Sequence, residues 1–212
     1  MASPSFRKIL QPKLKSMTPL SPYGTFHTKM ARALEEWFNK IGVDQYGIAN
    51  GTVTAPNGVT TLFIYPGLKL NVLRIYFDDE RVMSCGNVNG ELFFPKLFSY
   101  IGDVIAQQFI SWSSNPITAD SAAAMNPIML YGNTTSANSF ITKHFLNYGL
   151  DYRDVLTDQN PTDENLFDFV WDEFDNRMKS AINTIPPLTI SPVTGIVPWG
   201  VFNGTGTIKL EV

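Results

Sequence analysis

Residues 25–42, TFHTKMARALEEWFNKIG, carry apolar side chains that recur every three or four positions. This spacing gathers them on one side of a helix, leaves the charged residues on the other, and makes Gly42 a natural terminator. The run Val59–Tyr65, VTTLFIY, has instead the β-branched and aromatic composition of a strand, and APNG at 55–58 is a turn sequence. An amphipathic helix followed by short strands predicts helices packed on a sheet.

Further strands are expected on both sides of the chain's middle. Leu70–Phe77 is predicted to be a strand, and Asp78-Asp79-Glu80 the tip of a hairpin that returns through Arg81–Cys85. These runs make a small antiparallel meander of three or four strands. The tail, Leu188–Val212, is predicted to be extended again and to end in a strand over Thr207–Val212.

Three more amphipathic helices are expected from their apolar stripes: Pro95–Trp112, Ser136–Tyr148 and Thr162–Ile185. Thr162 is expected to cap the last of these, with acidic residues in its first turn. The predicted class is therefore α+β, with a small antiparallel β-meander packed by amphipathic helices.

Residues 1–24 differ from the rest of the chain. Prolines recur among serines and lysines, which favours extended backbone, and the segment contains four basic residues and no acid. We therefore expect an extended, basic, proline-rich N-terminal arm at 1–24, one α+β domain at 25–212 and a β-structured C-terminal tail within that domain.

The composition excludes several classes of protein. The chain is 44% hydrophobic and only 17% charged, which predicts a packed core under a neutral surface suited to subunit contacts. A net charge of −3 gives no general attraction for nucleic acid, so direct nucleic-acid binding is not expected. No apolar run reaches the ~20 residues of a membrane span, and the single cysteine forms no internal disulfide, which indicates synthesis in a cytoplasm-like compartment.

The residues that usually carry catalysis are scattered. His27 and His144 lie on separate predicted helices, and Cys85 has no cysteine partner with which to hold zinc. The acids Asp168, Asp172 and Asp175 are close enough on one helix to form an acid–base pair, but a solvated face that meets a basic partner is the simpler interpretation. We expect no enzyme activity, no metal and no cofactor.

The order of elements resembles that of tailed-bacteriophage virion proteins of the neck, of the tail-terminator or tail-completion type. The likeness lies in an arm, the helix Phe26–Ile41, a meander with a hairpin at residues 78–80, and a final strand after the helix Thr162–Ile185. The resemblance implies a non-catalytic subunit of a hexameric ring in the virion, made in the host cytoplasm and bound to copies of itself and to neighbouring virion proteins. Alternatives are a baseplate or capsid-associated protein and, in another class, a cellular enzyme or small-ligand-binding domain.

The subunit interface is predicted at three places. The arm contributes Arg7 and Lys8, which are drawn to an acidic helix of a neighbouring copy, and its apolar group. The hairpin tip and the irregular tail offer edges for pairing with another chain. The predicted interface residues are Arg7, Lys8, Ile9, Leu10, Leu14, Asp78, Asp79, Glu80, Trp199 and Phe202.

Overall fold

The structure is a computed structural model that describes residues 5–17, 23–41, 44–69, 75–86, 93–113, 117–119, 128–132, 137–149 and 165–212. The helices are α1 (Phe6–Lys15), α2 (Tyr23–Ile41), α3 (Asp79–Cys85), α4 (Phe93–Ser113), α5 (Ala137–Leu146) and α7 (Leu166–Asn183). The strands are β1 (Asp44–Thr54), β2 (Thr60–Pro66), β3 (Leu68–Lys69), β4 (Ile117–Ala119), β5 (Ile128–Gly132), β6 (Leu188–Val197) and β7 (Gly200–Glu211). Helices and a wholly antiparallel sheet confirm the α+β class.

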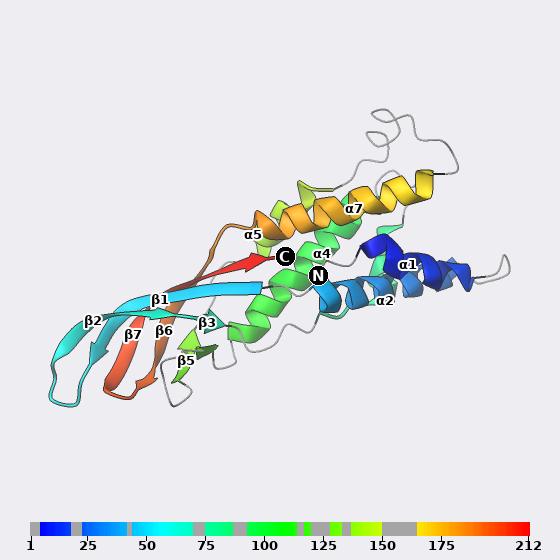
Figure 1. Cartoon of the computed structure of the whole chain (residues 1–212). Helices are drawn as coiled ribbons and strands as arrows, with labels where there is room; N and C mark the ends of the chain where they lie inside the picture. Colours follow the sequence, from blue (N-terminus) through cyan, green and yellow to red (C-terminus); the bar gives the residue numbers. More distant parts are fainter. Residues whose placement is uncertain are drawn as a thin grey trace.

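The helices gather at one end of the molecule, and the hairpins β1–β2 and β6–β7 extend away from them (Figure 1). The helices α2, α4, α5 and α7 begin and end within a few residues of the predicted ranges, because each has an apolar stripe long enough to be recognised. Their stripes meet in one core, where Leu34 and Trp37 of α2, Phe98 of α4 and Phe174 of α7 are fully buried. Thr162, the predicted cap of the last helix, lies outside the described residues.

The sheet order is β2-β1-β7-β6-β5-β4-β3, so the two strands at its ends are neighbours in the chain. The sheet therefore curls back on itself, and Gly67 joins its first and last strands. Gly67 has φ +87°, a conformation that glycine adopts without strain, and its N–H donates to Gly47 O at 2.9 Å. Leu68 then packs so closely on β1 that a Cβ at Gly47 would lie 2.0 Å from the Leu68 carbonyl oxygen.

The predicted extended arm is wrong for residues 6–15, which form α1. Phe6, Ile9 and Leu10 have helical spacing and are buried in the core, and Lys13 and Lys15 in the last turn suit the helix dipole. Pro12 lies inside the helix on its exposed side, where its missing N–H costs the helix one internal hydrogen bond. Burial of the opposite face, which carries Phe6, Ile9 and Leu10, outweighs the penalty of the proline.

The predicted hairpin at residues 78–80 is also wrong. Asp78 caps α3, because its carboxylate accepts hydrogen bonds from the backbone N–H groups of Glu80 at 2.8 Å and Arg81 at 3.4 Å. Asp79 and Glu80 occupy the first turn, where acids suit the positive end of the helix dipole. Of the predicted strand Leu70–Phe77, residues 70–74 lie outside the described residues, and residues 75–77 form no strand.

The tail is extended as predicted, over β6 and β7, but it is not an edge. β7 pairs with β1 on one side and with β6 on the other, so it lies inside the sheet. The APNG turn is confirmed between β1 and β2, where the Ala55 N–H donates to Val59 O at 2.9 Å. Between the helices α4 and α5, Ile128–Gly132 form β5, which pairs with β4 and β6.

Candidate assembly surface

Four strands of the projecting sheet contain almost no charge. The segments 45–68 and 185–208, which run from β1 through β2 and from the start of β6 far into β7, include no Asp, Glu, Lys, Arg or His. Charged residues make up 17% of the whole chain, so their absence from both hairpins is a local property of this end of the molecule. Solvent-exposed strands normally carry charges that keep other chains away.

Side chains alternate between two faces of this sheet, and cross-strand partners share a face. Inward-facing residues such as Val53, Phe202 and Ile208 are buried, which explains why the strands are apolar on that side. The opposite face, here called the outer face, carries Ile48, Leu62, Ile64, Ile196 and Val201 among threonines and asparagines.

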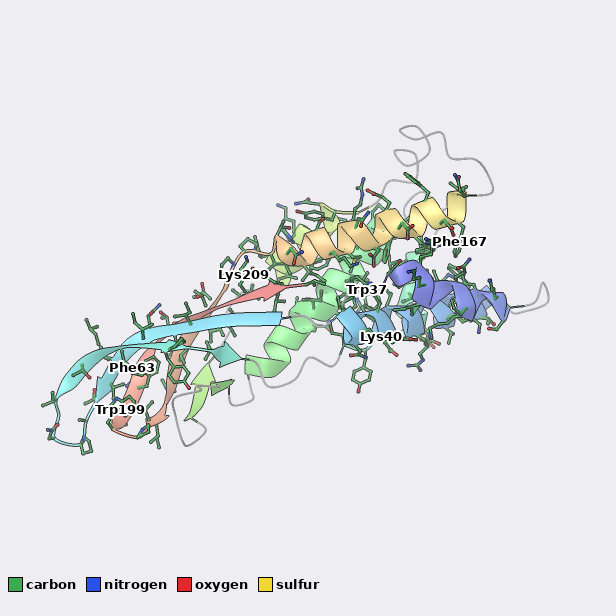
Figure 2. All side chains as sticks on the ribbon, viewed as in Figure 1. Trp37, Lys40, Phe63, Phe167, Trp199 and Lys209 are labelled. Carbon is green, nitrogen blue, oxygen red and sulfur yellow. The ribbon has the colours of Figure 1, made fainter. Side chains whose placement is uncertain are left out.

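The outer face is uncovered in the part of the chain that the structure describes. Leu62 is 89% exposed, Ile196 79% and Ile64 66%. Single exposed aliphatic residues are ordinary on protein surfaces, but several on one uncharged face form a patch typical of an interaction surface. Figure 2 shows side chains projecting from the β1–β2 and β6–β7 hairpins into open space.

An aromatic cluster closes the inner face near the ends of the two hairpins. The Phe63 ring lies 5.4 Å from the Trp199 ring in edge-to-face geometry, and both side chains are labelled in Figure 2. The Phe63 ring also lies 6.3 Å from the Phe202 ring, again edge to face. Phe202, a predicted interface residue, is instead fully buried in the protein's own core, where its strand lies between β1 and β6. Trp199, between β6 and β7, remains 49% exposed and stays available to a partner.

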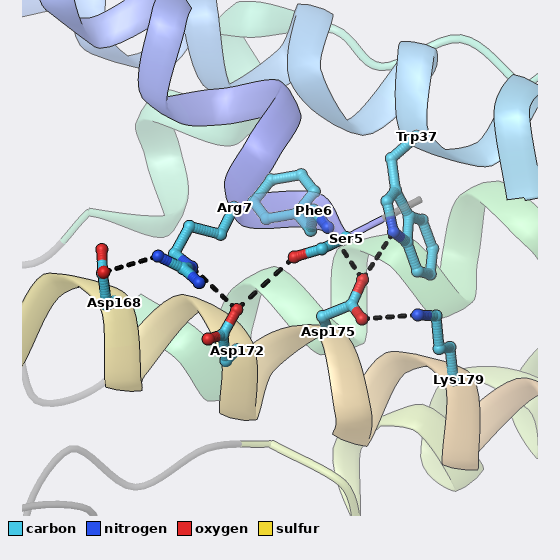
Figure 3. Close-up of polar contacts among 8 residues, drawn as sticks. All are labelled: Ser5, Phe6, Arg7, Trp37, Asp168, Asp172, Asp175 and Lys179. Atoms are coloured by element: carbon cyan, nitrogen blue, oxygen red, sulfur yellow. Dashed lines mark hydrogen bonds and ion pairs between the residues drawn. The ribbon is translucent and has the colours of Figure 1, made fainter. Parts of the chain in front are cut away.

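The basic and acidic segments that were expected to meet between copies meet within one chain. The Arg7 guanidinium lies 2.5 Å from an Asp168 carboxylate oxygen and 2.9 Å from one of Asp172 (Figure 3). The hydrogen bond with Asp172 is the main reason that the pKa of Arg7 is raised. Lys13 similarly reaches Glu36 of α2 at 2.6 Å. The pairing expected between copies therefore fastens α1 to α7 within one chain, and the Lys13–Glu36 pair fastens it to α2.

Asp175 of α7 is the polar centre of this attachment. One of its oxygens accepts hydrogen bonds from the Phe6 backbone N–H at 2.9 Å and from the Trp37 indole N–H at 2.7 Å (Figure 3). Its other oxygen accepts from the Lys179 ammonium at 2.6 Å. A buried carboxylate is tolerated when it is paired and hydrogen-bonded in this way, so Asp175 serves as a structural group and not as a free acid.

The remaining predicted interface residues fall at the helical end. Ile9 and Leu10 are buried in the protein's own core and Leu14 is partly buried against it, which removes them as anchors for another copy. Lys8 is exposed, and Asp78, Asp79 and Glu80 are exposed at the start of α3. The structure therefore leaves Trp199 as the predicted interface residue that adjoins the uncharged strands.

Candidate chemical groups are dispersed in the described residues. His144 Nε2 lies 2.9 Å from the Ala181 carbonyl oxygen, and Cys85 is buried, which raises the pKa of its thiol. No group of three or more His, Cys, Asp or Glu in the described ranges is placed to hold a metal ion. Among the described helices, none is long and apolar enough to cross a bilayer.

A depression of about 210 Å³ lies between α3 and α4, below the 300–1,000 Å³ usual for ligand pockets. Arg81 and Lys96 are the cations in its lining, and Arg81 lies 3.5 Å from Asp103 and stacks 4.5 Å from the centre of the Tyr100 ring. These contacts hold α3 against α4 and already occupy the Arg81 guanidinium, so the depression does not favour a ligand-binding function.

No family model, curated protein or solved structure matches the chain.

Proposed function

We propose that the protein is a non-catalytic structural subunit that assembles with copies of itself. The observation that supports this best is the uncharged, exposed aliphatic outer face on two projecting hairpins. Full burial of one leucine or isoleucine side chain contributes roughly 1.5–3 kcal/mol, so the outer face offers several such contributions to an interface. No comparable gain is available to an isolated monomer, in which these side chains remain in water.

The kind of assembly is proposed from the part of the expected element order that the fold retains. This part is the helix α2, an antiparallel sheet after it, and the final strand β7 after the helix α7, since the expected arm and hairpin contain the helices α1 and α3. A helical end joined to a projecting sheet suits the neck of a tailed-phage virion, where ring-forming subunits contact their own copies and the neighbouring head-proximal and tail proteins. In this proposal the hairpins make contacts between copies, while the charged helical end faces other virion proteins. The protein would then be made in the host cytoplasm and end in the virion.

The test is the mass of the purified protein in solution, measured by light scattering over a range of concentrations. We expect a discrete multimer for the parent and a shift towards monomer when Ile48 and Ile196 are both changed to Lys. Asn176→Lys, at an exposed position on α7, adds the same kind of charge away from the sheet and should leave the mass unchanged. A monomeric parent, or equal masses for all three proteins, would contradict the proposal.

A further inference from the structure

From Thr60 to Tyr65, the outer edge of β2 shows none of the features that protect sheet edges, as far as the described residues go. Natural edges are blunted by lysines, prolines, bulges, short length or a covering segment. β2 runs from Thr60 to Pro66 without a charge, its pairing with β1 is regular, and Pro66 is its last residue. Within the described residues no strand pairs with its outer side. The other end of the sheet order is β3, which spans only Leu68–Lys69.

The hydrogen-bond phase of the β1–β2 ladder shows which backbone groups face outward. The Gly67 N–H donates to Gly47 O and the Ala55 N–H donates to Val59 O, both at 2.9 Å. Hydrogen-bonded pairs alternate with non-hydrogen-bonded pairs in an antiparallel ladder, so Tyr65, Phe63 and Thr61 bond towards β1. The outward N–H and C=O groups are therefore those of Thr60, Leu62 and Ile64.

We infer that this edge pairs with β2 of a second copy, antiparallel and across a two-fold axis at Leu62. In that register Thr60 lies opposite Ile64 of the second copy, and Leu62 lies opposite Leu62 of the second copy. Each pair exchanges two hydrogen bonds. A register centred on Phe63 instead places Thr60 opposite Pro66, which has no N–H to donate. A register centred on Thr61 pairs Thr60 with Leu62 but places Ile64 opposite Gly58, outside the strand. The Leu62-centred register therefore forms the most backbone hydrogen bonds.

A second copy fits this edge better than a different partner does. No charge lies anywhere on β2, so self-pairing puts no like charges opposite each other, and a charged partner strand would find no counter-ion. Leu62 and Ile64 of both copies would join their outer faces into one aliphatic surface. The described sheet offers one long open edge and not two, which favours a two-fold contact over a head-to-tail one. Any ring built through this contact holds an even number of copies.

This inference rests on the proposed function, because it names one contact between copies, at the edge of the sheet that carries the outer face. Its first test is cross-linking of single-cysteine variants in a Cys85→Ala background under mild oxidation. The inferred register places the two Leu62 Cα atoms about 5.5 Å apart, within disulfide reach. It places a Thr60 about 14 Å from Thr60 of the other copy, and the same holds for Ile64. Leu62→Cys should link, Thr60→Cys and Ile64→Cys should not link alone, and an equal mixture of those two should link with each other.

A second pair of variants separates backbone pairing from side-chain packing. Leu62→Pro removes an outward N–H without breaking the β1–β2 ladder. Leu62→Thr keeps the N–H and introduces a β-branched side chain, which suits a strand. We expect loss of the multimer with Leu62→Pro and its retention with Leu62→Thr. An assembled parent whose Leu62→Cys variant does not link, or whose three variants link equally, overturns this contact and leaves the proposed function standing. A parent that is monomeric at every concentration overturns both.

Discussion

Phe6→Ala tests whether residues 6–15 belong to the folded core. Phe6 is fully buried, and its ring lies 4.8 Å from that of Phe174, 5.6 Å from that of Trp171 and 6.3 Å from that of Trp37. Truncation of a buried phenylalanine to alanine costs about 3–5 kcal/mol, because transfer free energy is lost and a cavity remains. For a protein of this size that loss lowers the melting temperature by roughly 6–20 °C.

Urea unfolding followed by tryptophan fluorescence measures this loss directly, because the indole rings that surround Phe6 report on the same cluster. Lys8→Ala is the matched control, since Lys8 lies in the same helix but its side chain is exposed. We expect that control to change the free energy of unfolding by less than about 0.5 kcal/mol. If Phe6→Ala is as mild as Lys8→Ala, the docking of α1 in the core is refuted and an undocked arm becomes the better description.

Three further changes probe other parts of the fold. Asp175→Ala leaves two buried donors, the Phe6 backbone N–H and the Trp37 indole N–H, without an acceptor. The free energy of unfolding in urea should therefore fall by about 2–6 kcal/mol, and an unchanged midpoint would contradict the network. Gly47→Ala should destabilise by more than about 2 kcal/mol in the same assay, because its Cβ would meet the Leu68 carbonyl; a neutral result would argue against the curled sheet. Burial raises the pKa of the Cys85 thiol, so its contribution to stability is present below the unfolded-state pKa and is lost as pH rises through the folded-state pKa. The urea midpoint of the parent should therefore fall more steeply at alkaline pH than that of Cys85→Ala, and parallel profiles would contradict this.

The elements with a long periodic pattern were predictable from the sequence. The stripe of α2, the APNG turn and the extended tail each follow from local spacing or turn chemistry, and each is present. α1 was missed because Pro12 argues locally against a helix, whereas the helix is held by burial of Phe6 and Leu10 against distant segments. Asp78-Asp79-Glu80 is ambiguous in sequence, since the same acids suit a hairpin tip and a helix N-terminus.

The candidate surface was predictable only in part. Local patterns carry no information on strand order, so nothing in the sequence indicated that β7 pairs with β1, which buries Phe202 and leaves β2 at the edge. A usable signal was nevertheless present. The run VTTLFIY lies inside a long segment without charge. An uncharged strand of this length is either a central strand of a sheet or an edge strand that pairs with another chain. Only the sheet order distinguishes these possibilities.

Amide hydrogen exchange along β2, followed as the protein concentration is raised, addresses assembly through this edge. In a dilute monomer the outward amides of Thr60, Leu62 and Ile64 should exchange rapidly, whereas the inward amides of Thr61 and Phe63 are protected by β1. We expect the three outward amides to become protected together, at the concentrations where light scattering shows a multimer. Outward amides that still exchange rapidly in the multimer would contradict assembly through this edge.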